Sequence, residues 1–295
     1  CPKWTAFISR IMGGSDSLIK FLQRAVGYSL TGSTQEQCFF LLHGTGANGK
    51  SVFLETMRAV LKDYAATAEF STFLAKQNEN VRNDIAALAG ARFVASSESG
   101  ADKRLSETII KALTGGDTIS ARFLFKEYFE FKPQFKVWMA TNHKPVIRDT
   151  DHAIWRRVRL IPFTVTIPEK ERNANLTKEL RDEYPAILAW AVRGCMDWMQ
   201  NGLGTPTEVE AATESYRNSM DIMESFIGDC CIRGENYVSG ATPIYARYSK
   251  WCDVNNEKPM TQREFSLRLG EKGFVREHTR LGSTWAGIGL VSEDM

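Results

Sequence analysis

Long hydrophobic runs are missing from this chain of 295 residues, and so is a charged leader followed by an apolar stretch. No apolar run approaches the roughly 18 residues that a membrane-spanning helix needs. With 43% hydrophobic and 24% charged residues, the composition is typical of a soluble globular protein and excludes a disordered or collagen-like chain. We therefore expect a cytoplasmic protein with no membrane partner. The chain starts at Cys1 rather than Met, so we expect the numbering to begin inside a longer protein.

Metal-binding spacings are also scarce. The chain has six cysteines and four histidines, with no C-x-x-C pair and no histidine spacing suited to zinc. Free thiols are therefore the favoured interpretation of the cysteines.

The net charge of +2 indicates no partner by itself, but the charge is unevenly distributed. Residues 103–159 contain 12 basic and six acidic residues, so this segment carries +6 and the rest of the chain −4. A basic segment on a nearly neutral protein is a candidate footprint for a polyanion. The alternative is a solvated face with scattered Lys and Arg.

Strand-like and helix-like patterns alternate through the middle of the chain. Continuous apolar runs typical of buried strands include residues 38–42, 135–140 and 158–163, and helical patterns lie among them. This alternation predicts an α/β core with a mainly parallel sheet, spanning residues 36–200. A helical segment, residues 1–35, precedes the core, and Gly27 is expected to end its helix.

Two further segments follow the core. Thr207 and Glu210 form a capping-box pattern, which predicts a helical connector over residues 205–233. Residues 234–240 are rich in turn formers and predict a loop. The module at 234–295 then shows two helical patterns followed by a hairpin pattern, which suggests a winged-helix-like unit.

The sharpest motif is a complete G-x-x-x-x-G-K-[ST]. It consists of Gly44, Thr45, Gly46, Ala47, Asn48, Gly49, Lys50 and Ser51. The motif follows a predicted buried strand and opens a predicted helix, as a phosphate-binding loop requires. Backbone N–H groups of such a loop surround the α- and β-phosphates, Lys50 supplies charge for the β- and γ-phosphates, and Ser51 supplies a Mg²⁺ ligand. We expect nucleotide binding; the alternative is a coincidental glycine turn.

Three polar positions follow the loop at the ends of predicted strands. Glu98 follows the strand at 92–95, where a carboxylate can hold a metal and polarise water; its alternative is a surface residue. Asn142 ends the next strand and can reach the γ-phosphate, or it is a turn residue. Arg157, beside Arg156, precedes the last strand, where an arginine can complete a neighbouring subunit's nucleotide site.

This order of motifs resembles the superfamily 3 helicases of small viruses, phages and plasmids. Within that family it is similar to the branch of the poxvirus primase-helicase and the phage/plasmid primases. The matching strings lie at residues 44–51, 88–94, 111–117, 141–145 and 154–157. The resemblance covers residues 15–200 well and the C-terminal module less specifically.

The resemblance implies an AAA+-like fold and a homo-hexameric ring that binds ATP and Mg²⁺ between subunits. It implies 3′→5′ translocation on single-stranded DNA at the replication fork, a primase domain before Cys1, and the cytoplasm of a bacterial host for a phage or plasmid protein. By position it makes Glu98 the catalytic acid and a metal ligand, Asn142 the polar sensor, and Arg157 a better finger than Arg156. Many relatives have two adjacent acids where Ser97 precedes Glu98 here, so the role of Glu98 stays divided between metal and water.

The same resemblance places a DNA-gripping hairpin inside the basic segment. Residues 123–131 predict a hairpin with its tip near Lys126. The candidate DNA contacts are Lys111, Arg122 and Lys126. A lysine suits sequence-independent tracking because it contacts phosphates without reading bases. Phe129 and Phe131 are expected to pack rather than to stack on bases.

The leading interpretation is an ATP-driven replicative DNA helicase, the motor part of a phage or plasmid primase-helicase. The first alternative is a P-loop ATPase that remodels protein or packages DNA through a winged-helix adaptor. The second is a DNA-binding regulator that uses ATP as a switch. From Ala241 onward the chain has eight basic and seven acidic residues, so DNA binding and protein docking both stay open for the C-terminal module.

Overall fold

The fold is described from a computed structural model of the chain. It describes residues 1–75, 82–97, 100, 103–148, 152–255, 257–279 and 282–291. The chain divides into two compact units, Cys1–Arg217 and Asn218–Met295. The expected segments 1–35 and 36–200 both fall in the first unit, and 234–295 falls in the second. The expected connector, 205–233, contributes to both.

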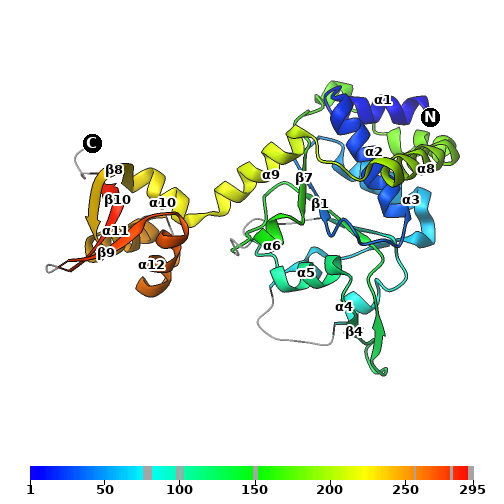
Figure 1. Cartoon of the computed structure of the whole chain (residues 1–295). Helices are drawn as coiled ribbons and strands as arrows, with labels where there is room; N and C mark the ends of the chain where they lie inside the picture. The colour runs from blue at the N-terminus through cyan, green and yellow to red at the C-terminus, as the bar shows by residue number, and fades with distance from the viewer. Residues whose placement is uncertain are drawn as a thin grey trace. The chain divides into compact units, whose positions relative to one another are not determined.

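A five-stranded parallel sheet forms the centre of the first unit (Figure 1). Its strands are β1 (Phe39–His43), β2 (Ala65–Thr67), β3 (Phe93–Ser97), β6 (Lys136–Thr141) and β7 (Val158–Pro162). Their order across the sheet is β2-β3-β6-β1-β7, so β6 lies between β1 and β3. The predicted α/β class with a mainly parallel sheet is confirmed. The short strand β2 was not predicted, because three residues are too few to show a period.

Helices α1 (Pro2–Ile11), α2 (Asp16–Leu30), α3 (Lys50–Leu61) and α8 (Tyr184–Asn201) share one core with a face of this sheet. Trp4 of α1 lies at its centre, with its ring 6.0 Å from Phe53 and 5.6 Å from Trp190 between centroids. On the other side of the sheet, α5 (Glu107–Gly115) buries Ile110 and Leu113, and Figure 1 shows α5 and α6 (His152–Trp155) together there.

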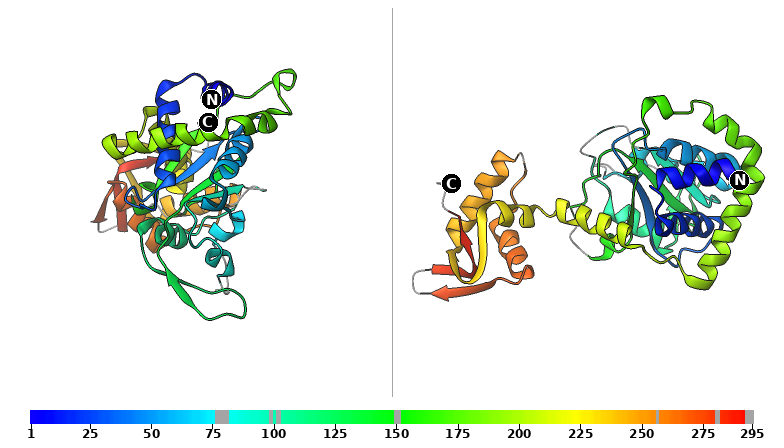
Figure 2. Two further views of the ribbon diagram at one scale, coloured as in Figure 1. Left: turned by 90° about the vertical axis from the view of Figure 1, so that its right-hand side faces the viewer. Right: turned by 90° about the horizontal axis from the view of Figure 1, so that it is seen from above.

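Gly27 does not end the second helix, as the sequence suggested. The helix continues to Leu30, and a Cβ at Gly27 would lie 2.0 Å from the backbone nitrogen of Cys195. A Cβ at Gly194 would likewise lie 2.1 Å from the carbonyl oxygen of Gln23. The two glycines therefore let α2 and α8 touch backbone to backbone, and Figure 2 shows these helices side by side. Close tertiary packing, which local pattern does not reveal, explains the glycine.

The remaining elements of the first unit are short, apart from α9. They are α4 (Asn83–Ala86), β4 (Ile119–Ala121), β5 (Phe129–Phe131), α7 (Leu176–Glu179) and α9 (Thr207–Met220). Helix α9 continues three residues past Arg217, where the first unit ends. Short 3₁₀ turns lie at Lys62–Tyr64, Phe70–Phe73, Glu169–Glu171 and Leu180–Glu183. Strands β4 and β5 pair antiparallel as a separate hairpin.

The second unit consists of α10 (Ile222–Cys230), β8 (Cys231–Gly240), α11 (Ala241–Val254), α12 (Gln262–Glu271), β9 (Val275–Thr279) and β10 (Gly282–Leu290). Its strands form an antiparallel sheet in the order β8-β10-β9. Residues 234–240 were expected to be a loop, which is wrong because they belong to β8. Pairing with β10 overrides the turn-forming composition, and most of this edge strand is exposed.

All six cysteines are free, as expected. Among the described residues, no helix is long and apolar enough to cross a membrane. Within the same residues, no group of three or more His, Cys, Asp or Glu side chains is placed to hold a metal ion.

Candidate functional site: a phosphate-binding loop and an exposed hairpin

The G-x-x-x-x-G-K-S motif forms the loop between β1 and α3. Gly49 has φ +84° and caps the helix that starts at Lys50. A Cβ on Gly44 would lie 2.5 Å from the carbonyl oxygen of Phe163. A side chain at Gly44 would therefore push the loop away from the residues that follow β7, and Gly49 adopts a backbone conformation that other residues rarely tolerate. The loop lies at the carboxyl edge of the parallel sheet, where ligands of open α/β sheets bind.

Asn48 organises the inside of this loop. Its side chain is only 2% exposed; its Oδ1 accepts a hydrogen bond from the Gly46 backbone N–H at 2.6 Å, and its Nδ2 donates to the carbonyl of Val165 at 3.2 Å. The backbone N–H of Ile167 also donates to the carbonyl of Ala47 at 2.9 Å. The segment after β7 therefore holds the loop from outside. The motif pattern treats position 48 as variable, so it gave no signal for this role.

Lys50 and Ser51 stand at the first turn of α3. The Lys50 side chain is 7% exposed, and its Nζ donates to the Gly44 carbonyl at 2.6 Å and to Asn48 Oδ1 at 3.1 Å. Burial lowers the pKa of Lys50 below its ordinary value. Ser51 is exposed beside it. The loop thus contains one buried cation and one accessible hydroxyl at a helix N-terminus, which is the arrangement that binds phosphate and a hard metal ion.

Asn142 lies at the same edge of the sheet. His43 at the end of β1 pairs with Thr141 at the end of β6, and the Gly44 N–H donates to the Thr141 carbonyl at 3.3 Å. Asn142 is therefore the next residue after a strand that contacts the loop directly, and it is exposed. Glu98, the predicted catalytic acid and metal ligand, lies outside the described residues.

His43 is a polar residue of this edge that the sequence reasoning missed. It is half-buried at the end of β1, and burial together with the charges of Lys144 and Lys50 lowers its pKa. His43 therefore stays neutral next to the loop at neutral pH. A lone histidine at a strand end carries no motif, which is why sequence alone did not find it.

An apolar pocket of about 480 Å³ adjoins the loop. Its walls come from α1, the loop itself, the start of α3 and the chain after β7, and include Phe7, Ala47, Val52 and Ile167. Lys3, Arg10 and Arg172 line it as well, and Glu179 and Glu171, also in the lining, pair with Lys3 and Arg10 at 2.9 and 2.6 Å. The pocket is of the size and polarity that accept a small aromatic ligand.

Arg156 and Arg157 lie at the opposite, amino edge of the sheet. The Phe39 N–H donates to the Arg157 carbonyl at 2.9 Å, so Arg157 is separated from the loop by the length of β1, about 16 Å at ~3.3 Å per residue. Its guanidinium is buried and donates to Thr114 Oγ1 at 3.1 Å and to the Ala153 carbonyl at 2.5 Å. Arg156 is exposed and, with Arg159, lines a groove of about 630 Å³ beside α9. Neither arginine lies at the carboxyl edge of the chain's own sheet.

The hairpin predicted at residues 123–131 begins earlier in the structure: its strands are β4 (119–121) and β5 (129–131), joined by residues 122–128. Lys126 is exposed in this connection, and its backbone N–H donates to the Phe123 carbonyl at 3.1 Å. Arg122 is half-buried with its guanidinium 4.6 Å from the centre of the Tyr128 ring. Lys111 lies apart from the hairpin, half-buried on α5.

The tip of this hairpin exposes apolar side chains to solvent. Phe125 is 102% exposed with φ +62°, and Leu124 is 59% exposed. A non-glycine residue at positive φ stores roughly 1–3 kcal/mol of strain. Below the tip, Phe129 is stacked between Phe123 and Phe131, with centroid distances of 5.8 and 5.9 Å. Phe129 and Phe131 contact neighbouring rings, but both are only half-buried, so the expected packing in the core is not met, and the exposed Phe125 was not predicted.

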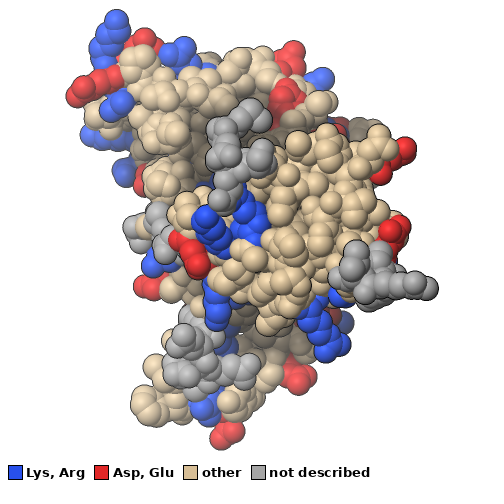
Figure 3. Space-filling model, turned by 90° about the vertical axis from the view of Figure 1, so that its left-hand side faces the viewer, with Lys and Arg blue, Asp and Glu red and all other residues tan. Residues whose placement is uncertain are grey.

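Not every cation of the basic segment reaches the surface. Lys136 is 2% exposed, and its Nζ donates to the Thr31 carbonyl at 2.6 Å and lies 4.3 Å from the centre of the Tyr28 ring. Burial lowers the pKa of Lys136 to about 7. With Arg157 also buried, the +6 of this segment overstates the charge it presents to a ligand. Figure 3 shows one face of the molecule, on which Lys and Arg are interspersed with Asp and Glu over a largely uncharged surface.

Residues 42–157 match the model of DUF5906, which is described as a family of unknown function. This span begins in β1 and ends at Arg157, so it contains the loop, the hairpin and Asn142.

Similar proteins come from viruses. "Putative helicase L207/L206" of Acanthamoeba polyphaga mimivirus is 29% identical over 263 residues, covering 81% of this chain and 27% of the relative. "Putative helicase 022R" of Frog virus 3 is 26% identical over 282 residues, covering 88% and 29%. "Putative primase C962R" of African swine fever virus is 22% identical over 262 residues, covering 81% and 27%. The chain thus spans less than a third of the length of each relative.

A solved structure, "The apo structure of NrS-1 C terminal region (305-718)", resembles the fold with a TM-score of 0.63 at 11% identity, covering 98% of this chain and 76% of that chain. A second structure of the NrS-1 C terminal region has a TM-score of 0.54 and covers 77% of this chain and 54% of that chain. These similarities support the α/β fold.

Proposed function

We propose that the chain is the ATP-driven motor of a replicative DNA helicase that acts on single-stranded DNA at the replication fork. The observation that carries the proposal is that the loop with Lys50 and Ser51 and the end of β6, which Asn142 follows, lie at the same edge of the sheet. The relatives named "Putative helicase" and "Putative primase" support a role in DNA replication.

The residues present fit ATP and Mg²⁺. The loop offers backbone N–H groups at the start of α3, with Lys50 as the phosphate-binding cation and the exposed Ser51 hydroxyl as a metal ligand. The apolar pocket next to Ala47 and Val52 fits a nucleoside base, with Phe7 as an apolar wall. Bound Mg²⁺ would neutralise charge on the phosphates, and Glu98 is proposed to orient the attacking water.

The arrangement of the sheet supports an AAA+-like, superfamily 3 assignment. Strand β6 lies between β1 and β3, and we propose that Asn142, the residue after β6, acts as the polar sensor of the nucleotide. Arg156 and Arg157 lie about 16 Å from the loop of their own chain, as strand length predicts. We therefore propose that they serve the nucleotide of a neighbouring subunit in a homo-hexameric ring, with the exposed Arg156 the more accessible of the two.

The hairpin β4–β5 is the proposed grip on DNA. Lys126 at its connection would contact phosphates, with Arg122 and Lys111 as secondary contacts, and translocation is proposed to run 3′→5′. Since the relatives are more than three times longer than the chain, a primase domain elsewhere in the protein fits the proposal. A phage or plasmid origin stays a prediction.

The second unit is proposed to be winged-helix-like. Its order helix, strand, two helices and a two-stranded hairpin, α10-β8-α11-α12-β9-β10, supports this proposal. Its own core of Phe226, Tyr248, Phe265 and Trp285 supports an independent module.

Strand separation tests the proposal. We expect the protein with ATP and Mg²⁺ to form a nucleotide-dependent hexamer and to unwind a forked duplex with a free 3′ tail, but not one with only a 5′ tail. Oligomer mass and release of a labelled strand are the two measurements. Unwinding that continues undiminished in Lys50→Ala would refute the proposed motor, and unwinding of the 5′-tailed duplex alone would reverse the polarity.

A further inference from the structure

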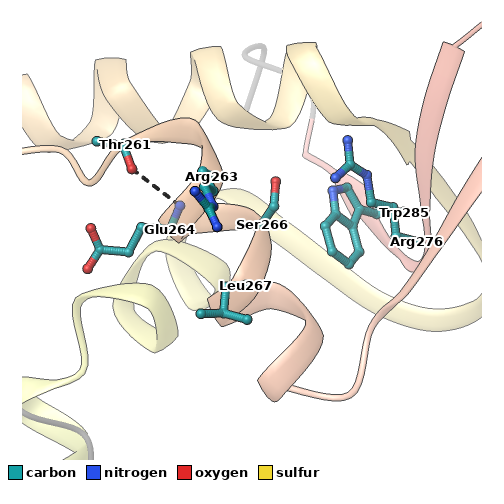
Figure 4. A pocket seen from close by; sticks show the side chains of 7 residues that line it. All are labelled: Thr261, Arg263, Glu264, Ser266, Leu267, Arg276 and Trp285. Carbon is teal, nitrogen blue, oxygen red and sulfur yellow. Dashed lines mark hydrogen bonds between the residues drawn. The ribbon is translucent and has the colours of Figure 1, made fainter.

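A groove of about 500 Å³ lies in the second unit, between helix α12 and the strands β9 and β10 (Figure 4). Arg263 and Leu267 line it from α12, and Arg276 and Trp285 line it from the strands. The rest of the lining is Thr261, Glu264 and Ser266. The accessible surface of the groove is mostly apolar, with an arginine on each wall. All of these residues belong to one compact unit, so the groove depends on no contact with the first unit.

The apolar part of the groove is formed by Leu267 and the Trp285 ring. Leu267 is 64% exposed, although Phe265 and Leu269 of the same helix are buried in the core of the unit. Trp285 is 3% exposed and belongs to that core, so the groove reaches the edge of the core. An exposed leucine beside a buried aromatic ring gains free energy when a ligand covers it. A ligand that fits this groove therefore carries an apolar group.

Trp285 also brings a buried polar atom to this wall. Its Nε1 has no hydrogen-bond acceptor among the residues that the structure describes. A buried indole N–H normally has a partner. An oxygen of a bound ligand that reached this N–H would supply the missing acceptor.

The two arginines of the groove are available to an anion. Arg263 and Arg276 are exposed, and within the described part of the chain no carboxylate lies at ion-pair distance from either. The Arg276 guanidinium lies 6.0 Å from the centre of the Trp285 ring, and its Nη2 donates to Ser283 Oγ at 3.4 Å. These contacts restrict the guanidinium without neutralising it. The Glu264 carboxylate points away from Arg276 and Trp285 in Figure 4, so it leaves this positive charge in place.

The charge of the whole unit opposes a polyanion. Residues 218–295 contain nine basic and eleven acidic side chains. Lys272, on the same side of the sequence as the groove residues, is already neutralised by Asp221 and Glu224. Binding of a nucleic-acid backbone is driven by many cations that neutralise successive phosphates. Two arginines separated by apolar surface instead match one or two carboxylates, which arginine binds through paired hydrogen bonds.

We propose that this groove docks a peptide segment of a partner protein that is both acidic and apolar. In the proposed complex an apolar side chain packs on Leu267 and the Trp285 ring. Carboxylates on either side of it pair with Arg263 and Arg276. The 10 residues of α12 span about 15 Å at ~1.5 Å per residue, which matches about four or five residues of extended peptide at ~3.3 Å each. Tryptophan and arginine are also the residue types that contribute most to binding at protein interfaces.

This docking function belongs to the second unit and needs neither ATP nor DNA. It therefore goes beyond the motor activity proposed for the first unit, and the two proposals can fail separately.

Fluorescence anisotropy of the full chain with labelled peptides tests the proposal. The probe is a short peptide in which glutamates flank a leucine and a phenylalanine. Companion peptides of the same length replace the glutamates by glutamine or by lysine, or the two apolar residues by serine. We expect saturable binding of the acidic probe, binding at least tenfold weaker for the glutamine and serine peptides, and none for the lysine peptide.

The arginines are tested by removing their charge. Arg263→Ala/Arg276→Ala should weaken binding of the acidic probe at least tenfold, because both carboxylates lose their partners. Lys250→Ala/Lys258→Ala removes two exposed cations of the same unit that do not line the groove, and it should bind as the wild type does.

The apolar contact is tested at Leu267. Leu267→Ala should weaken binding several-fold, because the probe loses its apolar neighbour. Val254→Ala is the matched control, since Val254 is 78% exposed in the same unit and does not line the groove.

A gain of binding provides a check that does not depend on loss of folding. Arg263→Glu/Arg276→Glu should lose the acidic probe and bind the lysine peptide instead. Failure of the wild type to bind the acidic probe overturns the proposal, as does equal binding by the Arg263→Ala/Arg276→Ala variant or equal loss in the Lys250→Ala/Lys258→Ala control. If the Arg263→Ala/Arg276→Ala variant loses binding of a labelled blunt duplex but keeps the peptide, the groove is a nucleic-acid surface and the proposal is wrong. We expect that variant to keep normal ATPase stimulation by single-stranded DNA; a parallel loss of stimulation would place the groove in the motor and overturn a separate docking function.

Discussion

The loop at residues 44–51 and the hairpin β4–β5 belong to one unit but differ in how far their side chains are buried. In the loop, Asn48 and Lys50 are 2% and 7% exposed and satisfy each other's polar groups. At the hairpin, Phe125 and Leu124 are 102% and 59% exposed, with Lys126 beside them. The loop is held by its own hydrogen bonds, whereas the tip is open to solvent. Changes in the first should affect hydrolysis, and changes in the second should affect its coupling to DNA.

The largest effect is expected from Lys50→Ala. Loss of the one buried cation of the loop should lower kcat for ATP hydrolysis by about a hundredfold or more, since a preorganised charge-stabilising donor contributes that much. Binding of single-stranded DNA should be unchanged. Steady-state ATPase and anisotropy check this, with Lys20→Ala, an exposed lysine of α2, as the control. If ATPase persists, the loop is not the catalytic site.

The reciprocal change is Lys126→Ala. Basal ATPase should stay within about twofold of the wild type, because the hairpin forms no part of the loop, while stimulation by single-stranded DNA should disappear as the phosphate contact is lost. ATPase with and without oligonucleotide is the measurement. A parallel loss of basal and stimulated ATPase would show that the hairpin does not act separately from the loop.

The third prediction concerns the arginines at the opposite edge of the sheet, which we propose to serve the loop of a second subunit. Arg156→Ala subunits mixed with Lys50→Ala subunits should recover part of the ATPase that each lacks alone, because each would supply what the other is missing. Arg157→Lys subunits mixed with Lys50→Ala subunits test the buried Arg157 in the same assay. No recovery in rings shown to mix contradicts action across an interface.

Phe125→Ala tests whether the exposed ring at the hairpin tip stacks on a base of single-stranded DNA. Base–aromatic stacking is worth about 1–3 kcal/mol per base, so affinity for single-stranded DNA should fall about tenfold with an unchanged salt slope. Phe125→Tyr should retain the affinity. A change in the salt slope instead would mean that Phe125 acts by positioning Lys126.

The last prediction concerns the stability of the fold and Lys136, a cation of the basic segment that belongs to neither site. Its pKa of about 7 lies below its ordinary value of 10.5, so between those values the unfolded chain binds the extra proton and stability rises with pH. Lys136→Met should reduce this rise, by on the order of 1 kcal/mol per pH unit. Denaturant unfolding from pH 7 to 10 measures it; parallel curves for the two proteins would contradict the assigned burial.

The loop is predictable from the sequence because its glycines, lysine and serine form a complete motif. The strands at 39–43, 136–141 and 158–162 are predictable because they are continuous apolar runs. It does not reveal contacts made at long range. Gly27 reads as a helix stop but permits contact with Cys195, Lys136 reads as surface charge but is buried, and β8 reads as a loop but pairs with β10. The role of Asn48 depends on Val165, which lies 117 positions away in the chain.

Stimulation of ATP hydrolysis by single-stranded DNA tests most directly whether the loop and the hairpin belong to one DNA motor. Wild-type protein is titrated with an unstructured oligonucleotide at saturating ATP and Mg²⁺. We expect kcat to rise several-fold and to saturate with the oligonucleotide, with no rise for Lys126→Ala. A wild-type rate that stays flat at oligonucleotide concentrations where binding is complete would contradict a DNA-driven motor.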